Sequence, residues 1–182
     1  MKLKRLLVTA VLVFCLGTAA YAGEVALTSI GQGPDAMMIK VLMRSLKVTP
    51  DYDAVMQPEA LTDQKVLVAV VGGSSKGLGA AGIDKEQEVE RTKALCEAAI
   101  AKGIKVLVMH VGGEGRRGTL SDLFINAVAQ YGDAFIVVDG GNGDGIFNPY
   151  AEKKGLAILT APNVKGTKDP LGEVLSGWEV TQ

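Results

Sequence analysis

Three short apolar runs, each followed directly by glycine or Asp-Gly, constrain the fold of this chain more than any other feature. The runs span residues 65–71, 105–111 and 134–138. They show little alternation between polar and apolar residues, which is typical of strands buried on both faces of a parallel sheet. The sequence therefore predicts the centre of an α/β sheet with helices on either side.

Segments with helical features separate these runs. Pro34 suits the first turn of a helix, and that helix carries an apolar face formed by Met38, Val41, Leu42, Ser45 and Leu46. Asp84 and Gln87 have the spacing of a capping box, which predicts the start of a second helix. Its inner face would hold Val89, Cys96, Ala99 and Ile100.

A third helix is predicted near residues 119–131, with Thr119 and Asp122 as its cap. Phe124 and Val128 belong to apolar residues that recur at helical spacing. Shorter segments complete the pattern: strands at 25–30, 52–56 and 156–159, and a last helix at 169–175. This βαβα order predicts a three-layer α/β domain, flavodoxin-like or Rossmann-like. We expect a mostly parallel sheet of five or six strands in the order 2-1-3-4-5, with right-handed crossovers.

The N-terminal residues predict export. A basic start is followed by an apolar run at 6–16 and by Ala20-Tyr21-Ala22, the pattern that signal peptidase recognises. The alternative, an uncleaved anchor, is disfavoured because the run is short for about 30 Å of hydrocarbon. We expect a signal peptide at 1–22, one domain at 23–182, and a periplasmic or secreted location.

The charge of the expected mature domain limits its partners. Lys2, Lys4 and Arg5 account for three of the 19 basic residues, so the remaining 160 residues carry 16 basic and 20 acidic side chains. This acidic balance argues against a nucleic-acid partner. Residues 23–182 contain no second apolar stretch long enough to cross a membrane, and Cys96 is their one cysteine.

Glycine-rich loops follow the first, third and fourth predicted strands. In a sheet of the expected order these loops meet at the carboxyl edge, where α/β proteins bind ligands. The candidate ligand-binding residues are Gln32, Gly33, Gly73, Ser74, Ser75, Lys76, Gly113, Glu114, Arg116 and Arg117. For any one loop, glycines that merely form a tight turn are the better explanation; three such loops at one edge favour a binding site.

The chemistry of these loops suits an anion. Successive glycines let backbone N–H groups turn toward a ligand, and Ser74, Ser75 and Lys76 add donors and positive charge. Arg116 and Arg117 can each grip a carboxylate or phosphate through two parallel hydrogen bonds. We therefore expect binding of a small anionic or polar solute, without catalysis.

Two motif matches fail in context. Residues 77–82 fit G-x-G-x-x-G but begin several residues after the strand, and their last glycine precedes the expected helix start. Asp139, Asn142 and Asp144 suggest calcium, but their spacing is out of register with a calcium loop. The sequence accordingly predicts no nucleotide cofactor and no metal.

Two alternatives remain open. His110 near Glu114 and Asp139 suggests a hydrolase or lyase with histidine as its base, although a core histidine satisfied by backbone is the simpler interpretation. A domain this small offers only an open crevice, which also suits an accessory interaction protein of an envelope or transport complex.

Two segments identify a resemblance. GGSSKGLGAAGID at 72–84 and MHVGGEGRRGTLSD at 109–122, which contains an HxGGExRRG pattern, resemble an uncharacterised bacterial family of small exported α/β proteins classed as a domain of unknown function. The resemblance implies export and a single domain. It implies no activity, ligand or catalytic residue.

Overall fold

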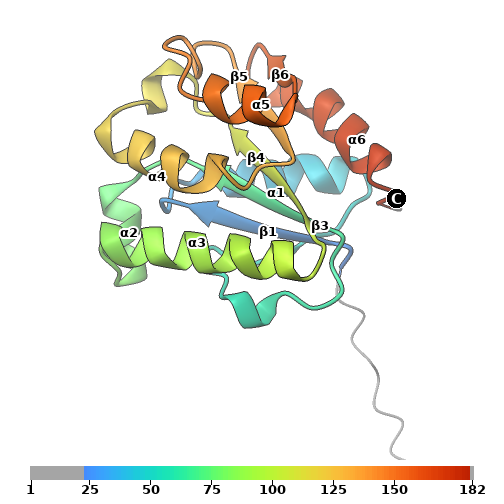
Figure 1. The fold of residues 1–182 in the computed structure, drawn as a ribbon, viewed down its shortest axis with the longest axis horizontal. Helices are drawn as coiled ribbons and strands as arrows, with labels where there is room; N and C mark the ends of the chain where they lie inside the picture. The colour runs from blue at the N-terminus through green and yellow to red at the C-terminus, as the bar shows by residue number, and fades with distance from the viewer. Residues whose placement is uncertain (1–22, 181–182) are drawn as a thin grey trace, which may run out of the picture.

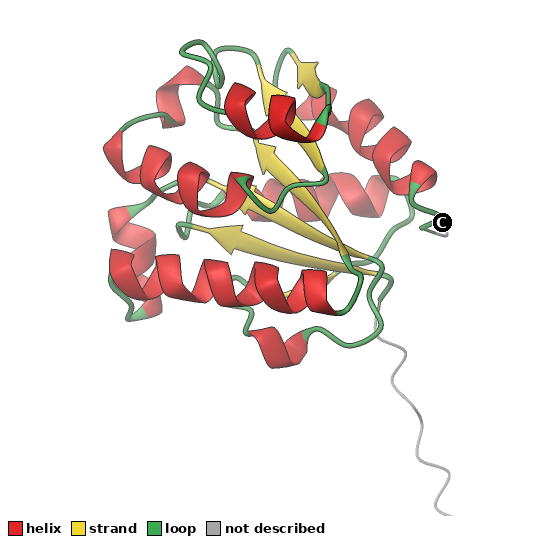
Figure 2. Cartoon of the chain, viewed as in Figure 1, coloured by secondary structure: helices red, strands yellow, loops and turns green. Residues whose placement is uncertain are grey.

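Six parallel strands form one sheet, and helices cover both of its faces (Figure 1; Figure 2). The structure, a computed structural model, describes residues 23–180. The strands are β1 (Val25–Ile30), β2 (Asp51–Tyr52), β3 (Val66–Val71), β4 (Lys105–His110), β5 (Ala134–Val138) and β6 (Ile158–Ala161). Their order is β2-β1-β3-β4-β5-β6, so the predicted order is confirmed and extended by a sixth strand.

Two helical layers enclose the sheet. The helices are α1 (Asp35–Ser45), α2 (Ser75–Ala81), α3 (Lys85–Ala101), α4 (Thr119–Ala129), α5 (Asn148–Lys154) and α6 (Lys168–Gly177). Helices α3, α4 and α5 pack on one face, in front of the sheet in Figure 1, and α1 and α6 pack on the other. The three-layer α/β fold expected from the sequence is confirmed.

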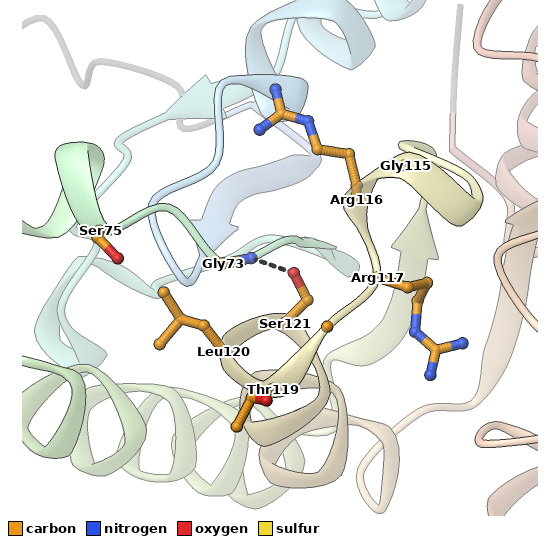
Figure 3. A pocket seen from close by; sticks show the side chains of 9 residues that line it. Gly73, Ser75, Gly115, Arg116, Arg117, Thr119, Leu120 and Ser121 are labelled. Carbon is orange, nitrogen blue, oxygen red and sulfur yellow. Dashed lines mark hydrogen bonds between the residues drawn. The ribbon is translucent and has the colours of Figure 1, made fainter.

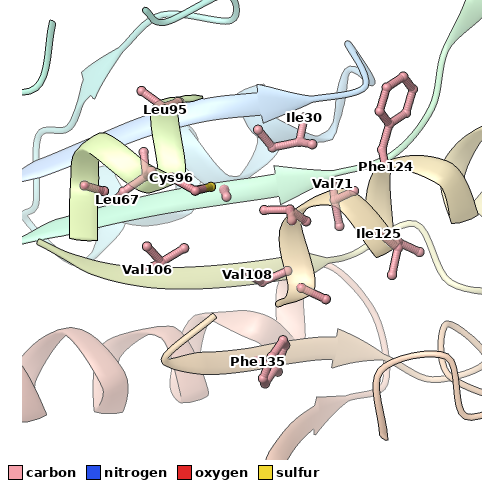
Figure 4. Close-up of a cluster of buried hydrophobic side chains, with 14 of the residues drawn as sticks. Ile30, Leu67, Val71, Leu95, Cys96, Val106, Val108, Phe124, Ile125 and Phe135 are labelled. Carbon is pink, nitrogen blue, oxygen red and sulfur yellow. The ribbon is translucent and has the colours of Figure 1, made fainter. Parts of the chain in front are cut away.

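The strands are apolar on both sides because both sides are covered. Every residue of β1 and β3 is buried, and the two strands pair in register from Val25 with Val66 to Ile30 with Val71. Figure 4 shows the front core, where Cys96 lies among strand and helix side chains. Cys96 is completely buried, as predicted, and this burial raises the pKa of its thiol to about 12.

The buried faces of two helices differ in part from those predicted from the sequence. Met38 and Val41 on α1 are about half exposed, and the residues buried against the sheet are Ala36, Ile39 and Met43. Ile100, predicted on the inner face of α3, is also exposed. The rest of the predicted α3 face is correct, since Cys96 and Ala99 are buried and Val89 packs against the core. On α1 the prediction was wrong by part of a turn: Leu42 and Leu46 pack partly against the core, but apolar residues on several faces of this helix hid the buried one.

The segment after β3 is partly helical rather than a loop. Ser74 caps α2, its Oγ accepting a hydrogen bond from Gly77 N at 3.0 Å, and Leu78 anchors the helix in the core. The glycines suggested an open loop because glycine normally weakens helices. Two boundaries also differ: β2 covers only Asp51–Tyr52, and the N-cap of α4 is Gly118 instead of Thr119.

None of the helices within residues 23–180 combines the length and apolar character needed to span a bilayer. The predicted signal peptide at 1–22 lies outside the described residues, so export stays a prediction.

Candidate functional site

The loops after β1 and β3 lie against each other at the carboxyl edge of the sheet. Gln32 and Gly73 form an isolated antiparallel bridge, and Ser74 N donates to Gly31 O at 2.9 Å. A Cβ at Gly33 would lie 2.7 Å from Gly72 O, so only glycine fits this approach. The predicted meeting of these two loops is therefore observed.

The loop after β3 also contacts the start of α4. Gly73 N donates to Ser121 Oγ at 2.9 Å, as the dashed line in Figure 3 marks. A Cβ at Gly73 would lie 2.8 Å from both Leu120 Cγ and Ser121 N. The loops that follow β1, β3 and β4 are thus joined into one edge.

A pocket of about 350 Å³ opens between the β3 loop and the β4 loop. Its walls are Gly73, Ser75 and residues 115–121, as Figure 3 shows. Gly118, the N-cap of α4, has no side chain to cap the helix, and the first N–H groups of a helix lack intrahelical partners. This end of α4 carries partial positive charge, which favours an anionic or electron-rich group.

Arg116 lies on the rim of this pocket, and it reaches toward α1. Its stem packs over Gly112, where any Cβ would overlap it. Its Nη2 is 3.8 Å from Asp35 Oδ1, and its side chain keeps 39% of its exposure. The aliphatic part of the Arg116 side chain is therefore fixed by packing, whereas its guanidinium group has only a long ion pair.

Asp35, the first residue of α1, was missed by the sequence analysis. It is buried, at 6% exposure, and its Oδ2 has no hydrogen-bond partner among the described residues. A Cβ on Gly72 would lie 3.3 Å from that oxygen. In sequence, an acid in the first turn of a helix needs no explanation beyond the helix dipole, so nothing there indicated its burial.

Arg117 points away from Arg116 in Figure 3 and is fully engaged. Its Nε donates to Asp122 at 2.8 Å, and its two terminal nitrogens donate to the Asp144 carboxylate and to Gly141 O. The hydrogen bonds to Asp144 and then to Asp122 raise the pKa of Arg117. The hydrogen bond from Arg117 in turn lowers the pKa of Asp144 to about 2. Arg117 joins the loops after β4 and β5.

The remaining candidates are dispersed. Gln32 turns its amide toward Ala54 O and Glu88, away from the pocket. Ser74 is occupied as the helix cap, and Lys76 is exposed on α2. Ser75 faces the pocket.

His110 is completely buried. Its Nδ1 lies 2.9 Å from Val71 O and its Nε2 lies 3.3 Å from Gly113 O. Glu114 and Asp139, its suggested partners, are exposed. A ring that is sealed from solvent and faces backbone oxygens favours a structural role over that of a general base.

A buried ion pair behind the β1 loop also escaped the sequence analysis. Glu88 and Arg91 on α3 pair at 2.7 Å, and Glu88 Oε1 accepts from Gly31 N at 2.7 Å. Arg91 donates onward to Ser29 O and Met56 O. Residues 88 and 91 lie on the same helix turn, but their backbone partners are more than 30 positions away in the chain, so no local pattern reveals the network.

Within residues 23–180, no group of three or more His, Cys, Asp or Glu side chains is arranged to hold a metal ion.

Comparison with known proteins gives a family but no function. The family model described as Domain of unknown function (DUF6305) matches residues 22–175. No curated protein matches. Two solved structures align over most of the chain: AlinE4, an SGNH-hydrolase family esterase (11% identity, TM-score 0.31, 84% of this chain and 92% of that one), and a serine-to-alanine mutant of the same esterase (12%, 0.31, 87% and 81%). At these values neither alignment transfers an activity.

Proposed function

The chain belongs to the DUF6305 family, a domain of unknown function, and from the geometry of its site we propose that it binds a small anionic or polar solute at the carboxyl edge of the sheet. The pocket between the β3 and β4 loops would receive the ligand.

One observation carries this proposal: the pocket opens onto the uncapped N-terminus of α4. Its volume, about 350 Å³, lies at the small end of the range for ligand sites. Backbone N–H groups and the hydroxyls of Ser75 and Thr119 supply donors. Such a lining suits a compact polar molecule better than an apolar one.

Arg116 adds a positive charge at the rim of the pocket. Of the two arginines proposed from sequence, Arg117 is held by Asp122 and Asp144, whereas Arg116 has one long ion pair and remains partly exposed. We therefore assign ligand binding to Arg116 and loop anchoring to Arg117. The predicted signal peptide would place this binding in the periplasm or outside the cell.

A thermal-shift screen of residues 23–182 against carboxylates, phosphates, sugars and amino acids tests the proposal. A ligand at 100 times its Kd stabilises the native state by about 2.7 kcal/mol. We expect one class to raise Tm with dose, and R116M to weaken that binding about tenfold or more. The control K93M removes an exposed charge from α3 and should leave binding intact. A flat screen, or equal binding by R116M, would contradict the proposal.

The accessory-protein alternative has one supporting observation. Met37, Met38 and Val41 are 48–61% exposed on α1 and form an apolar face, which is the kind of surface that protein partners cover. Photo-crosslinking from position 41 in the full chain should capture one defined envelope partner under this alternative, and position 93 should not. Equal capture from both positions would count against it.

A further inference from the structure

Helix α1 carries an exposed surface that combines apolar and basic side chains. Met37, Met38 and Val41 are 48–61% exposed, and most of the large apolar side chains found exposed in residues 23–180 belong to this helix. Arg44, three positions after Val41, and Lys47, just beyond the helix, are exposed as well. These five residues are called the α1 surface below.

The opposite side of α1 fixes the orientation of this surface. Ala36, Ile39 and Met43 are buried against the sheet. The α1 surface therefore faces outward from the layer that α1 and α6 form behind the sheet (Figure 1). The exposed side of such a helix is convex, and an amphipathic helix of this kind can lie flat on a planar partner.

The exposed charges of α1 have one sign. Its one acidic residue, Asp35, is buried, and neither Arg44 nor Lys47 has an ion-pair partner among the described residues. Residues 23–182 as a whole carry more acidic than basic side chains, 20 against 16. A cationic strip on an acidic domain is complementary to an anionic partner.

The edge of the sheet beside α1 adds one more cation. Lys40 Nζ lies 4.6 Å from the centre of the Tyr52 ring on β2. The acid next to that tyrosine, Asp53, accepts a hydrogen bond from Val55 N at 2.9 Å and forms no ion pair with the described basic residues. The charge of Lys40 therefore adds to that of the α1 surface.

Anionic lipid fits this surface better than an acidic protein does. Exposed apolar side chains beside Lys and Arg are the features with which surface helices bind anionic membranes. The core of a protein interface, in contrast, is depleted in charged residues, and lysine is depleted in interfaces generally. On α1 the basic and apolar side chains share one narrow strip.

We propose that the α1 surface binds the domain to an anionic phospholipid membrane. Its apolar side chains insert among the headgroups, and its basic side chains contact the lipid phosphates. The binding is reversible, because a few side chains provide far less affinity than a membrane-spanning helix. This role goes beyond solute binding, and none of the five residues lines the pocket.

Sedimentation of residues 23–182 with vesicles tests the proposal. Residues 1–22 are left out because their apolar run would itself bind lipid. One set of vesicles is pure phosphatidylcholine, and the other contains about 30% phosphatidylglycerol. We expect binding to the anionic vesicles to be about tenfold or more tighter at low salt. It should be lost near about 1 M salt, where charges are screened beyond about 3 Å.

Variants separate the contributions of charge and apolar contact. R44Q/K47Q removes two charges from the α1 surface and should weaken binding about tenfold or more. M37Q/V41Q keeps both charges and should weaken binding by a smaller factor, about threefold or more. The control K93Q/K153Q removes two exposed lysines from α3 and α5, on the opposite face, and should bind like the unaltered chain.

The other outcomes overturn the proposal. Equal binding to both kinds of vesicle, or an equal loss in R44Q/K47Q and K93Q/K153Q, would show that the α1 surface does not recognise anionic lipid. Absence of vesicle binding, together with crosslinking from position 41 to one protein, would assign the surface to a protein partner. An unchanged Tm confirms that each variant is folded. Solute binding is tested through other residues, so either proposal can fail alone.

Discussion

Glu88 and Asp35 are both buried carboxylates near the end of β1, yet their surroundings are opposite. Glu88 accepts four hydrogen bonds, from Gly31 N, the Gln32 amide and two nitrogens of Arg91, at 2.7–3.1 Å. Asp35 has one ion-pair contact, at 3.8 Å, and an oxygen without a donor among residues 23–180. A carboxylate whose oxygens are all occupied holds its surroundings in place, whereas one with an unoccupied, buried oxygen contributes little to holding them.

Glu88 and its hydrogen-bond partners fix the conformation of the loop after β1. Its hydrogen bonds to Gly31 and Gln32 hold two residues with positive φ, at 84° and 59°. Gln32 then pairs with Gly73 and so sets the position of the β3 loop. Asp35 lies beside this frame, and its own ion pair, with Arg116, is longer, at 3.8 Å.

Breaking the Glu88 pair should have the largest effect. R91M leaves Glu88 charged and buried, and we expect the free energy of unfolding to fall by about 3–5 kcal/mol in urea titrations. The double variant E88Q/R91M keeps an acceptor for Gly31 N without a buried charge and should recover part of that loss. If R91M lost less than about 1 kcal/mol, the pair would not be what holds the loop.

A substitution at Gly77 tests how closely α2 packs against the β1 loop that Glu88 holds. A Cβ there would overlap the Gln32 carbonyl oxygen, whereas Gly79, two residues later in α2, has open space. We expect G77A to cost about 1–3 kcal/mol and G79A to raise stability by up to about 1 kcal/mol. Thermal unfolding of the two variants is a matched comparison, and equal Tm values would show that α2 is not pressed against the β1 loop.

The Asp35 side should tolerate change. D35N replaces a carboxylate that has one long ion pair with an amide of the same shape. Because the amide removes a buried charge while giving up only the 3.8 Å ion pair, we expect the free energy of unfolding to lie within about 1 kcal/mol of that of the unaltered chain, or above it. A loss as large as that of R91M would mean that Asp35 is structural like Glu88, and the contrast between the two carboxylates would disappear.

The smallest expected effect on stability comes from the ion pair between Arg117 and Asp144. The hydrogen bonds from Arg117 lower the pKa of Asp144 from 3.8 to about 2, so the pair stabilises the fold above pH 3.8 and loses this contribution as pH falls through about 2. The Tm difference between the unaltered chain and D144N should shrink over that interval. The exposed Asp139, in the same loop, provides the control D139N. A difference independent of pH would contradict the assignment.

The fold was predictable because its signals are local. The apolar runs predict buried strands, and Asp84 with Gln87 caps α3 with the capping box observed. Crossover handedness then leaves few strand orders. Helix α2 was missed because its glycines conceal a helix that Ser74 and Leu78 stabilise.

The site was only partly predictable. The meeting of the glycine-rich loops follows from strand order. The different states of Arg116 and Arg117 depend on Asp35 and on Asp144, which lie far from them in sequence. Two adjacent arginines look identical in the chain, and only tertiary contacts distinguish the occupied one from the loosely paired one.

The packing of Arg116 over Gly112 has a consequence for which residues can be varied at this edge. A side chain at position 112 would occupy the space of the Arg116 stem and so displace the arginine from the pocket that it lines. The position of the charge is therefore set by a residue that carries no charge and no side chain, and a substitution at Gly112 should act on the pocket as strongly as a substitution of the arginine itself.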